Sequence, residues 1–262
     1  MKHYLLVYKK LIKLNFATWV IYRGNFINSL IGSTIWGVFH FISIIILTSK
    51  ISSVYGWTRN ELIMLTASFS FLWGFFHLFF AINFEEMAEI INRGNLDQFL
   101  LKPLDSQFLL SFNRINFSGF IRTIIGFIVL LYIIVLKHMQ VSLINILEFL
   151  LLVGCGLILI YSIWFLLATV IIWFPKLTNL VAFLFHISGI SRYPPEIVKE
   201  LNTFTFIFLL PLVIFVSTPT KALLNRLFYG DVFELVFFMI LLLLASRKFW
   251  KFALRYYTSA SS

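Results

Sequence analysis

Three uninterrupted apolar runs constrain this chain more than any other feature of its sequence. Residues 26–48 and 62–84 comprise 23 residues each, and residues 149–174 comprise 26, without one Asp, Glu, Lys or Arg. A helix needs about 20 such residues to cross the hydrocarbon core of a bilayer, which is roughly 30 Å thick. Because only 12% of all residues are charged and 60% are hydrophobic, the sequence predicts an all-α integral membrane protein.

The remaining apolar segments are less regular. Together with residues 26–48 and 62–84, crossings are predicted at 117–136, 146–174 and 228–246, while residues 177–191 and 201–220 are two imperfect segments. The third crossing must include Arg122, which either reaches lipid phosphates from a cytoplasmic end or contacts a substrate or partner. We expect only one of the two imperfect segments to cross fully and the other to be re-entrant, with its broken backbone buried in protein or facing water.

The distribution of basic residues predicts the topology. Fourteen of the 21 Lys and Arg residues lie on one side if the N-terminus, residues 85–122, Lys176 and the tail at 247–262 all face the cytoplasm. This bias follows the positive-inside rule and requires an even number of crossings. We therefore predict six crossings, with both termini in the cytoplasm and the whole chain, residues 1–262, forming one transmembrane domain.

The N-terminal residues 1–23 carry lysines beside an apolar helical face, which predicts an amphipathic helix lying in the membrane interface. An ordinary basic tail is the alternative. The net charge of +10 is therefore attributed to topology and contact with anionic lipids, and not to nucleic acid. The single Cys155 excludes a disulfide or a cysteine metal site within one chain.

A polar segment at residues 85–112 separates the second and third predicted crossings; we call it the coupling segment. It contains three closely spaced carboxylates in a chain otherwise poor in acids: Glu85, Glu86 and Glu89. Gly94 is predicted to end this helix in the left-handed conformation, and Pro103 to end a second short helix. Since so short a segment has little core of its own, we expect it to dock on another protein. The alternative is a solvated loop that contacts only lipid headgroups.

Several kinds of chemistry have no motif in this sequence. It lacks a G-x-x-x-x-G-K-[ST] loop for ATP, an H-E-x-x-H zinc motif and a G-x-S-x-G nucleophile. His40 and His77 fall deep in the first two predicted crossings, where they form either a proton relay or, more commonly, a polar contact between helices. No carboxylate lies in mid-span, which argues against a secondary carrier driven by protons or sodium.

Three stretches, in order along the chain, carry a family resemblance. They are RGNLDQFLLKP at 93–103, RYPPEI at 192–197 followed by FLLPLVIFVSTP at 208–219, and FALRYYTSASS at 252–262. With these motifs the chain resembles the permease subunits of ABC-2 type exporters, in the branch formerly labelled only as a domain of unknown function. The resemblance covers essentially the whole chain.

The resemblance implies a permease without catalytic residues, cofactor or metal of its own. It pairs with an identical or sister permease over two ABC ATPase subunits, which bind ATP and magnesium, in the inner membrane of a bacterium. The substrate class expected is hydrophobic or amphiphilic: a lipid, glycolipid, drug-like molecule or peptide. A scaffold subunit of an envelope or secretion complex that transports nothing is the alternative.

The resemblance also implies that residues 177–191 form the fifth crossing and that residues 192–222 form outer re-entrant helices. It implies two sets of functional residues as well. Contact with the ATPase is expected from Glu85, Glu86, Glu89, Arg93, Gly94, Leu96, Asp97, Phe99, Leu100, Lys102 and Pro103. The glutamates would pair with basic residues of the ATPase, while three apolar side chains, Leu96, Phe99 and Leu100, would fill its groove. An outer gate is expected at Tyr193, Pro194, Pro195, Pro211 and Pro219, because proline breaks helices at fixed places. The alternative is that these prolines are ordinary helix ends in loops.

Overall fold

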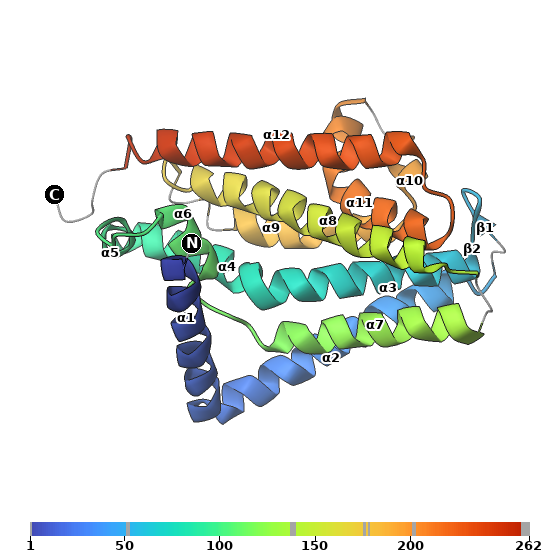
Figure 1. The fold of residues 1–262 in the computed structure, drawn as a ribbon, viewed down its shortest axis with the longest axis horizontal. Helices are drawn as coiled ribbons and strands as arrows, with labels where there is room; N and C mark the ends of the chain where they lie inside the picture. Colours follow the sequence, from blue (N-terminus) through green and yellow to red (C-terminus); the bar gives the residue numbers. More distant parts are fainter. Residues whose placement is uncertain are drawn as a thin grey trace.

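Long helices lying side by side form the body of the protein in a computed structural model (Figure 1). The structure describes residues 2–50, 53–136, 140–174, 177, 179–200 and 203–257. Lys176 and the last five residues, which entered the sequence predictions, lie outside the described residues. Within them, five helical stretches are long and apolar enough to cross a membrane: Arg23–Leu47, Arg59–Asn92, Ser118–Leu136, Leu143–Val170 and Tyr229–Ala253. The protein is therefore an all-α, multi-pass membrane protein.

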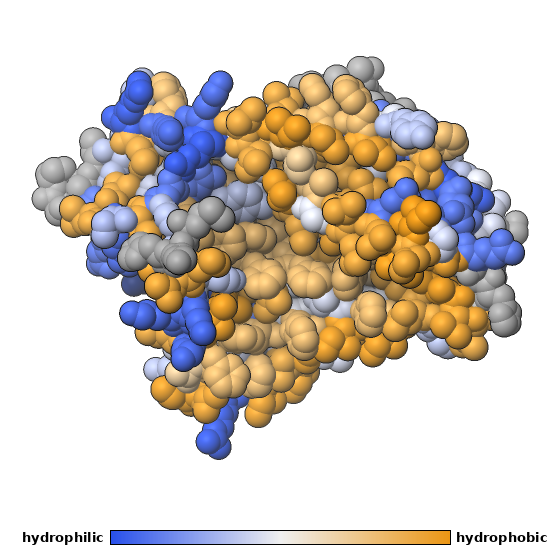
Figure 2. All heavy atoms as spheres, viewed as in Figure 1, coloured by the Kyte–Doolittle hydropathy of each residue, from blue (hydrophilic) through white to orange (hydrophobic). Residues whose placement is uncertain are grey.

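The two ends of this bundle differ from its middle. Helix α1 (Lys2–Ile21) stands across the bundle at one end, which also holds α5 (Asp97–Leu100) and α6 (Ser106–Phe112) (Figure 1). The opposite end holds a hairpin of β1 (Ser53–Val54) and β2 (Trp57–Thr58). Figure 2 shows hydrophilic residues gathered at both ends and a broad hydrophobic band between them. This band has the character of a surface that faces lipid.

One continuous helical stretch runs through the centre of the bundle. It consists of α3 (Arg59–Phe76), the π-helical turn η1 (His77–Ala81) and α4 (Ile82–Asn92). Its 34 residues make it about 51 Å long at about 1.5 Å per residue, which exceeds the roughly 30 Å of hydrocarbon. The α4 end of this stretch therefore projects beyond the hydrocarbon, at the same end of the bundle as α1.

Helix α3 packs closely on α7 (Ser118–Leu136) because both carry glycine at the points of contact. A Cβ atom on Gly126 would lie 2.5 Å from the amide nitrogen of Phe71, and one on Gly119 would lie 2.6 Å from that of Leu78. Such backbone approach between membrane helices requires small residues. Helix α8 (Leu143–Val170) begins where the Ser142 hydroxyl accepts a hydrogen bond from the Asn145 amide at 3.2 Å. It packs against both α11 (Thr203–Leu223) and α12 (Tyr229–Ala253).

Two shorter apolar helical stretches, Leu180–Arg192 and Phe208–Leu223, pack among the long helices. The first comprises α9 (Leu180–Ile187) and the 3-10 turn η2 (Ser188–Arg192), and α10 (Pro195–Lys199) follows it. The second belongs to α11 (Thr203–Leu223), a single helix that contains two prolines, Pro211 and Pro219. The expectation that these prolines break the helix is therefore wrong, although six crossings and re-entrant helices remain predictions.

The last helix, α12 (Tyr229–Ala253), continues through the basic residues at its end. Arg247, Lys248 and Lys251, which the sequence assigned to a tail, extend the helix by two turns. Because α12 ends on the same side of the bundle as α1 (Figure 1), these cations lie near the coupling segment. This placement brings the C-terminal part of the chain into the candidate functional site.

Candidate functional site

The coupling segment begins on α4 and turns sharply at Gly94. Gly94 has a φ of +69°. Two backbone hydrogen bonds end α4 here: the Asn95 amide donates to the Ile90 carbonyl at 2.9 Å, and the Gly94 amide donates to the Ile91 carbonyl at 3.1 Å. This is a Schellman ending, in which glycine is favoured because it lacks a Cβ atom. The prediction of a left-handed helix end at Gly94 is confirmed.

Two of the three glutamates already have partners within the chain. The carboxylate of Glu86 lies 2.5 Å from the Arg114 guanidinium, and that of Glu89 lies 2.7 Å from the guanidinium of Arg93, one helical turn away. Glu85 is exposed, and no ion pair of the described residues includes it. Of the three, Glu85 is thus the carboxylate most readily available to a partner protein.

The apolar side chains of the coupling segment are divided between core and surface. Leu96 and Phe99 are buried in the core of the chain itself, and the Lys102 ammonium lies over the Phe99 ring at 5.0 Å from its centroid. The expectation that Leu96 and Phe99 insert into a partner is therefore corrected, because neither side chain is accessible. Leu100 is 37% exposed and Leu101 is 85% exposed, so both of these side chains are accessible at the surface.

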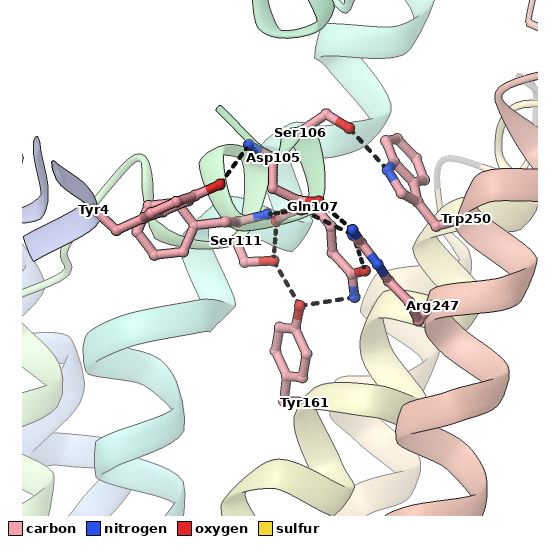
Figure 3. Close-up of polar contacts among 9 residues, drawn as sticks. Tyr4, Asp105, Ser106, Gln107, Ser111, Tyr161, Arg247 and Trp250 are labelled. Carbon is pink, nitrogen blue, oxygen red and sulfur yellow. Dashed lines mark hydrogen bonds and ion pairs between the residues drawn. The ribbon is translucent and has the colours of Figure 1, made fainter. Parts of the chain in front are cut away.

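An ion pair ties the end of the coupling segment to α12. Asp105 begins α6 and accepts a hydrogen bond from the Phe108 amide at 3.1 Å. The Arg247 guanidinium donates to both carboxylate oxygens of Asp105, at 2.9 Å to Oδ1, and to the Gln107 side-chain oxygen at 3.0 Å (Figure 3). Such two-pronged charge-assisted contacts fix geometry as well as adding energy.

Further hydrogen bonds attach the same turn to two other helices. Gln107 donates to the Tyr161 hydroxyl of α8 at 3.1 Å, and Ser111 lies 3.0 Å from that hydroxyl. The Trp250 indole of α12 donates to Ser106 at 3.1 Å, and the Asp105 amide donates to the hydroxyl of Tyr4 on α1 at 3.3 Å. Figure 3 shows these side chains converging on the start of α6. We name them the polar anchor: Tyr4, Asp105, Ser106, Gln107, Ser111, Tyr161, Arg247 and Trp250.

The ionisation of Asp105 makes the polar anchor sensitive to acid. Partial burial raises the pKa of Asp105, but the hydrogen bonds and charge of Arg247 and the Phe108 amide outweigh it, so the pKa lies below its ordinary value. A carboxyl with a lowered pKa in the folded state stabilises the protein above its unfolded pKa of about 3.9, and this contribution is lost as pH falls through the folded pKa.

We therefore expect the melting temperature of the native protein to exceed that of Asp105→Asn by a constant margin between about pH 5 and pH 8. The margin should begin to shrink as pH falls below about 4, near the unfolded pKa, and it should disappear only below the lowered pKa of the native carboxyl. Thermal unfolding of both proteins in detergent measures it. A margin that grows towards acid pH would contradict the stabilising role of the ionised carboxylate.

At the opposite end of the bundle, the segment that carries three of the expected gate residues, Tyr193, Pro194 and Pro195, continues into residues that contact the β hairpin, whereas Pro211 and Pro219 lie within α11. Pro194 and Pro195 are buried, and Pro195 begins α10. From the hairpin, the Tyr55 hydroxyl donates to Glu200 at 2.6 Å and the Trp57 indole donates to Glu196 at 3.1 Å. Tyr193 is half-buried next to them. The sequence interpretation missed the hairpin entirely, because two-residue strands leave no periodic pattern.

Two residues singled out within the membrane have aromatic neighbours. The His40 ring lies 5.5 Å from Phe69 and the His77 ring 5.6 Å from Trp73, while Phe69 and Trp73 stack on each other at 5.4 Å. In the described part of the chain no hydrogen bond joins the two histidines, so this arrangement contains no direct proton relay between them. Arg122 is also buried, at 7% exposure, which corrects the expectation that it reaches lipid phosphates.

Comparison with known protein families identifies the chain. A family model described as ABC-2 family transporter protein matches residues 34–261. This chain belongs to the ABC-2 transporter family. Searches among curated proteins and among solved structures gave no significant match. As an ABC-2 family protein with several membrane-spanning helices, the chain is the membrane component of a transporter, and the resemblance that the three motifs indicated is confirmed.

The polar anchor of this ABC-2 protein includes residues that the sequence alone did not single out. Asp105 could have been recognised as a helix start, because Asp directly before an apolar helix is a frequent N-cap. Its partner Arg247 lies 142 residues away, and Tyr161 is one polar residue in a long apolar run. No spacing rule connects them, so only the folded chain reveals the site.

Proposed function

We propose that this chain is the permease of an ATP-driven exporter whose ATPase is a separate protein. The observation that carries the proposal is the coupling segment. It begins on α4 at the same end of the bundle as α1, exposes Glu85 and Leu101, and is tied to α8 and α12 through the polar anchor. A displacement imposed on this segment would therefore pass directly to two long helices. Family membership supports the proposal, because it implies association with an ABC ATPase in general.

In this proposal the α1 end of the bundle faces the cytoplasm of a bacterium, where ATP is available. Two ATPase subunits bind ATP and magnesium, and two permeases, identical or sister chains, share the membrane. Closure of the ATPases pushes the two coupling segments and alternates the permeases between inward and outward states. The hairpin contacts to Glu196 and Glu200 lie at the other end, where an outer gate has to open and close.

Two neighbouring pockets on the protein favour an amphiphilic substrate. A groove of about 910 Å³ lies among α1, α2 (Arg23–Leu47) and α7, and its lining is almost wholly apolar, with Arg23 as its one charged residue. A second pocket of about 650 Å³ adjoins it and shares Trp19, Phe26 and Ile115, but it also presents Asn15, Asn113 and Arg114. A molecule with an apolar chain and a polar head fits two such neighbouring surfaces.

Charge reversal at the exposed carboxylate tests the docking. We expect Glu85→Lys, combined with Leu101→Glu, to reduce recovery of an ATPase with the permease at least tenfold and to reduce ATP-dependent transport equally. Both changes affect exposed side chains, so the melting temperature should change little. The measurement is purification of the tagged permease from its native membrane, with mass spectrometry of the proteins bound to it.

Glu234→Lys is the matched control, because Glu234 is an exposed carboxylate near the hairpin end of α12. This variant should retain the ATPase. If Glu85→Lys with Leu101→Glu also retains ATPase and transport, the coupling segment is not the docking site. If the native permease is recovered without any ATPase, a scaffold subunit becomes the better explanation of the chain.

A further inference from the structure

Two arginines within the bundle have no acidic partner among the described residues: Arg122 is buried and Arg192 is half-buried. Arg122, on the second turn of α7, is 7% exposed, and its Nε has no hydrogen-bond partner among the described residues. Arg192, the last residue of η2, has a buried Nε and a buried Nη1 that also lack partners. Their charges repel each other. Each guanidinium thus has buried N–H groups without a protein acceptor among the described residues, although the Arg192 guanidinium also lies 5.5 Å from the centroid of the Tyr193 ring.

The acidic residues of the chain do not neutralise these arginines. All eleven lie in the described part of the chain, and its ion pairs join acids to five other cations: Arg93, Arg114, Lys221, Arg226 and Arg247. The surrounding stretches contain no carboxylate either, since none occurs between Asp105 and Glu148 or between Glu148 and Glu196. An unpaired charge inside a membrane protein is costly and usually marks a functional site.

Other unsatisfied polar groups occur on the helices packed around the arginines. The Trp164 indole of α8 is fully buried without an acceptor, and a buried ring nitrogen of His40 on α2 has no partner among the described residues. His40 interacts electrostatically with both arginines. The walls are aromatic: Trp164 lies 5.5 Å from Trp73 and 5.6 Å from Phe185. We name Arg122, Arg192, His40 and Trp164 the buried donor cluster.

We infer that the buried donor cluster binds the anionic head of an amphiphile, a phosphate or a carboxylate. Guanidinium groups match the oxygens of these anions with paired hydrogen bonds, and an indole N–H adds a donor but no acceptor. Because the cluster lies among membrane helices, its ligand should also carry an apolar chain. The inference deepens the proposed function and rests on it for the statement that the bound amphiphile is transported substrate; binding itself does not depend on the ATPase.

The test uses the purified full-length permease in phosphatidylcholine nanodiscs, without ATPase. Three probes separate the sources of the anion: fluorescent lysophosphatidic acid, the uncharged monoacylglycerol with the same chain, and inorganic phosphate. We expect lysophosphatidic acid to bind at least tenfold more tightly than either of the others. If inorganic phosphate bound as tightly as lysophosphatidic acid, the ligand would not need an apolar chain and the inference of an amphiphile would be wrong. If monoacylglycerol bound as tightly as lysophosphatidic acid, the inference that the cluster recognises an anion would be wrong.

Variants then assign the binding to the cluster. Arg122→Gln and Arg192→Gln should each weaken lysophosphatidic acid binding at least tenfold. The affinity of Arg122→Lys should lie between that of the glutamine variants and that of the native protein, because lysine keeps the charge without the paired donors. Arg59→Gln, the same change at an exposed arginine, should bind normally.

Melting temperatures without ligand separate binding from folding. Because removal of an unpaired buried charge removes a cost to folding, the melting temperature of each glutamine variant should be equal to or higher than that of the native protein. Native binding by both glutamine variants, or a lowered melting temperature with unchanged binding, would show that the arginines are structural. ATPase recovery is measured separately, so a failure of this inference can be distinguished from a failure of the proposed function.

Discussion

Replacement of Gly126 by leucine is expected to prevent stable packing of α3 on α7. The added Cβ atom alone would lie 2.5 Å from the Phe71 amide nitrogen and 2.8 Å from the Ala67 carbonyl oxygen. Both atoms belong to the backbone of a central helix and cannot rotate away as a side chain would. We expect the free energy of unfolding to fall by roughly 3 kcal/mol, the upper end for an overpacked core, with most of the protein lost on extraction into detergent.

The control is Gly154→Leu on α8, because a Cβ atom at Gly154 would meet nothing within 4 Å. That variant should be as stable as the native protein or slightly more so, since leucine favours a helix more than glycine does. Gly126→Ala, which adds only the Cβ atom, should fall between them. The measurement is the monodisperse fraction after size-exclusion chromatography, together with the melting temperature. Equal yields of Gly126→Leu and Gly154→Leu would contradict the close packing of α3 and α7.

Glycines show how far the sequence could predict this fold. Gly94 was predictable because a polar helix, a glycine and a proline follow each other within a short stretch, which is a local pattern. Gly126 was not, because its role depends on which helix lies opposite, and an apolar run has the same appearance on its lipid-facing and buried sides. The positions of the long helices likewise follow from apolar run length, but their pairing does not.

The candidate site, like the fold, could be predicted only in part from the sequence. Its location between the second and third predicted crossings followed from composition, and the exposed Glu85 belongs to the acidic cluster that the sequence marked. Leu96 and Phe99 were assigned to a partner surface, yet they are buried, because a short amphipathic helix does not reveal whether its apolar face meets its own chain or another. The prolines of α11 were interpreted as breaks, but neighbouring helices in a membrane can support a helix that contains them.

Loss of the ion pair between Asp105 and Arg247 is expected to uncouple the permease from its ATPase without dissociating the two. In the proposed function the coupling segment transmits its displacement to α12 through this pair, which lies away from the exposed Glu85 and Leu101. Charge-assisted hydrogen bonds contribute about 1.5–3 kcal/mol, and we expect about 1–2 kcal/mol here, because the Arg247 side chain is 40% exposed and solvent weakens the pair. A tenfold change in an equilibrium corresponds to about 1.4 kcal/mol.

The substitutions are chosen so that the helix start at Asp105 is preserved. Asparagine is as good an N-cap as aspartate, so Asp105→Asn removes the charge and keeps the acceptor for the Phe108 amide, whereas Asp105→Ala removes both. Arg247→Gln removes the charge from the other side. ATP-dependent transport should fall roughly tenfold in Asp105→Asn and in Arg247→Gln, while ATPase recovery and basal ATP hydrolysis should stay near the native values.

The double variant decides whether the two residues act through each other. If Asp105 and Arg247 act as a pair, combining Asp105→Asn with Arg247→Gln should cost little more than either change alone, because the second substitution removes a partner that is already lost. Independent roles would multiply the two losses to about a hundredfold. Lys248→Gln, which removes the neighbouring charge on α12, should transport normally. A multiplied loss, or an equal loss in Lys248→Gln, would contradict transmission through this ion pair.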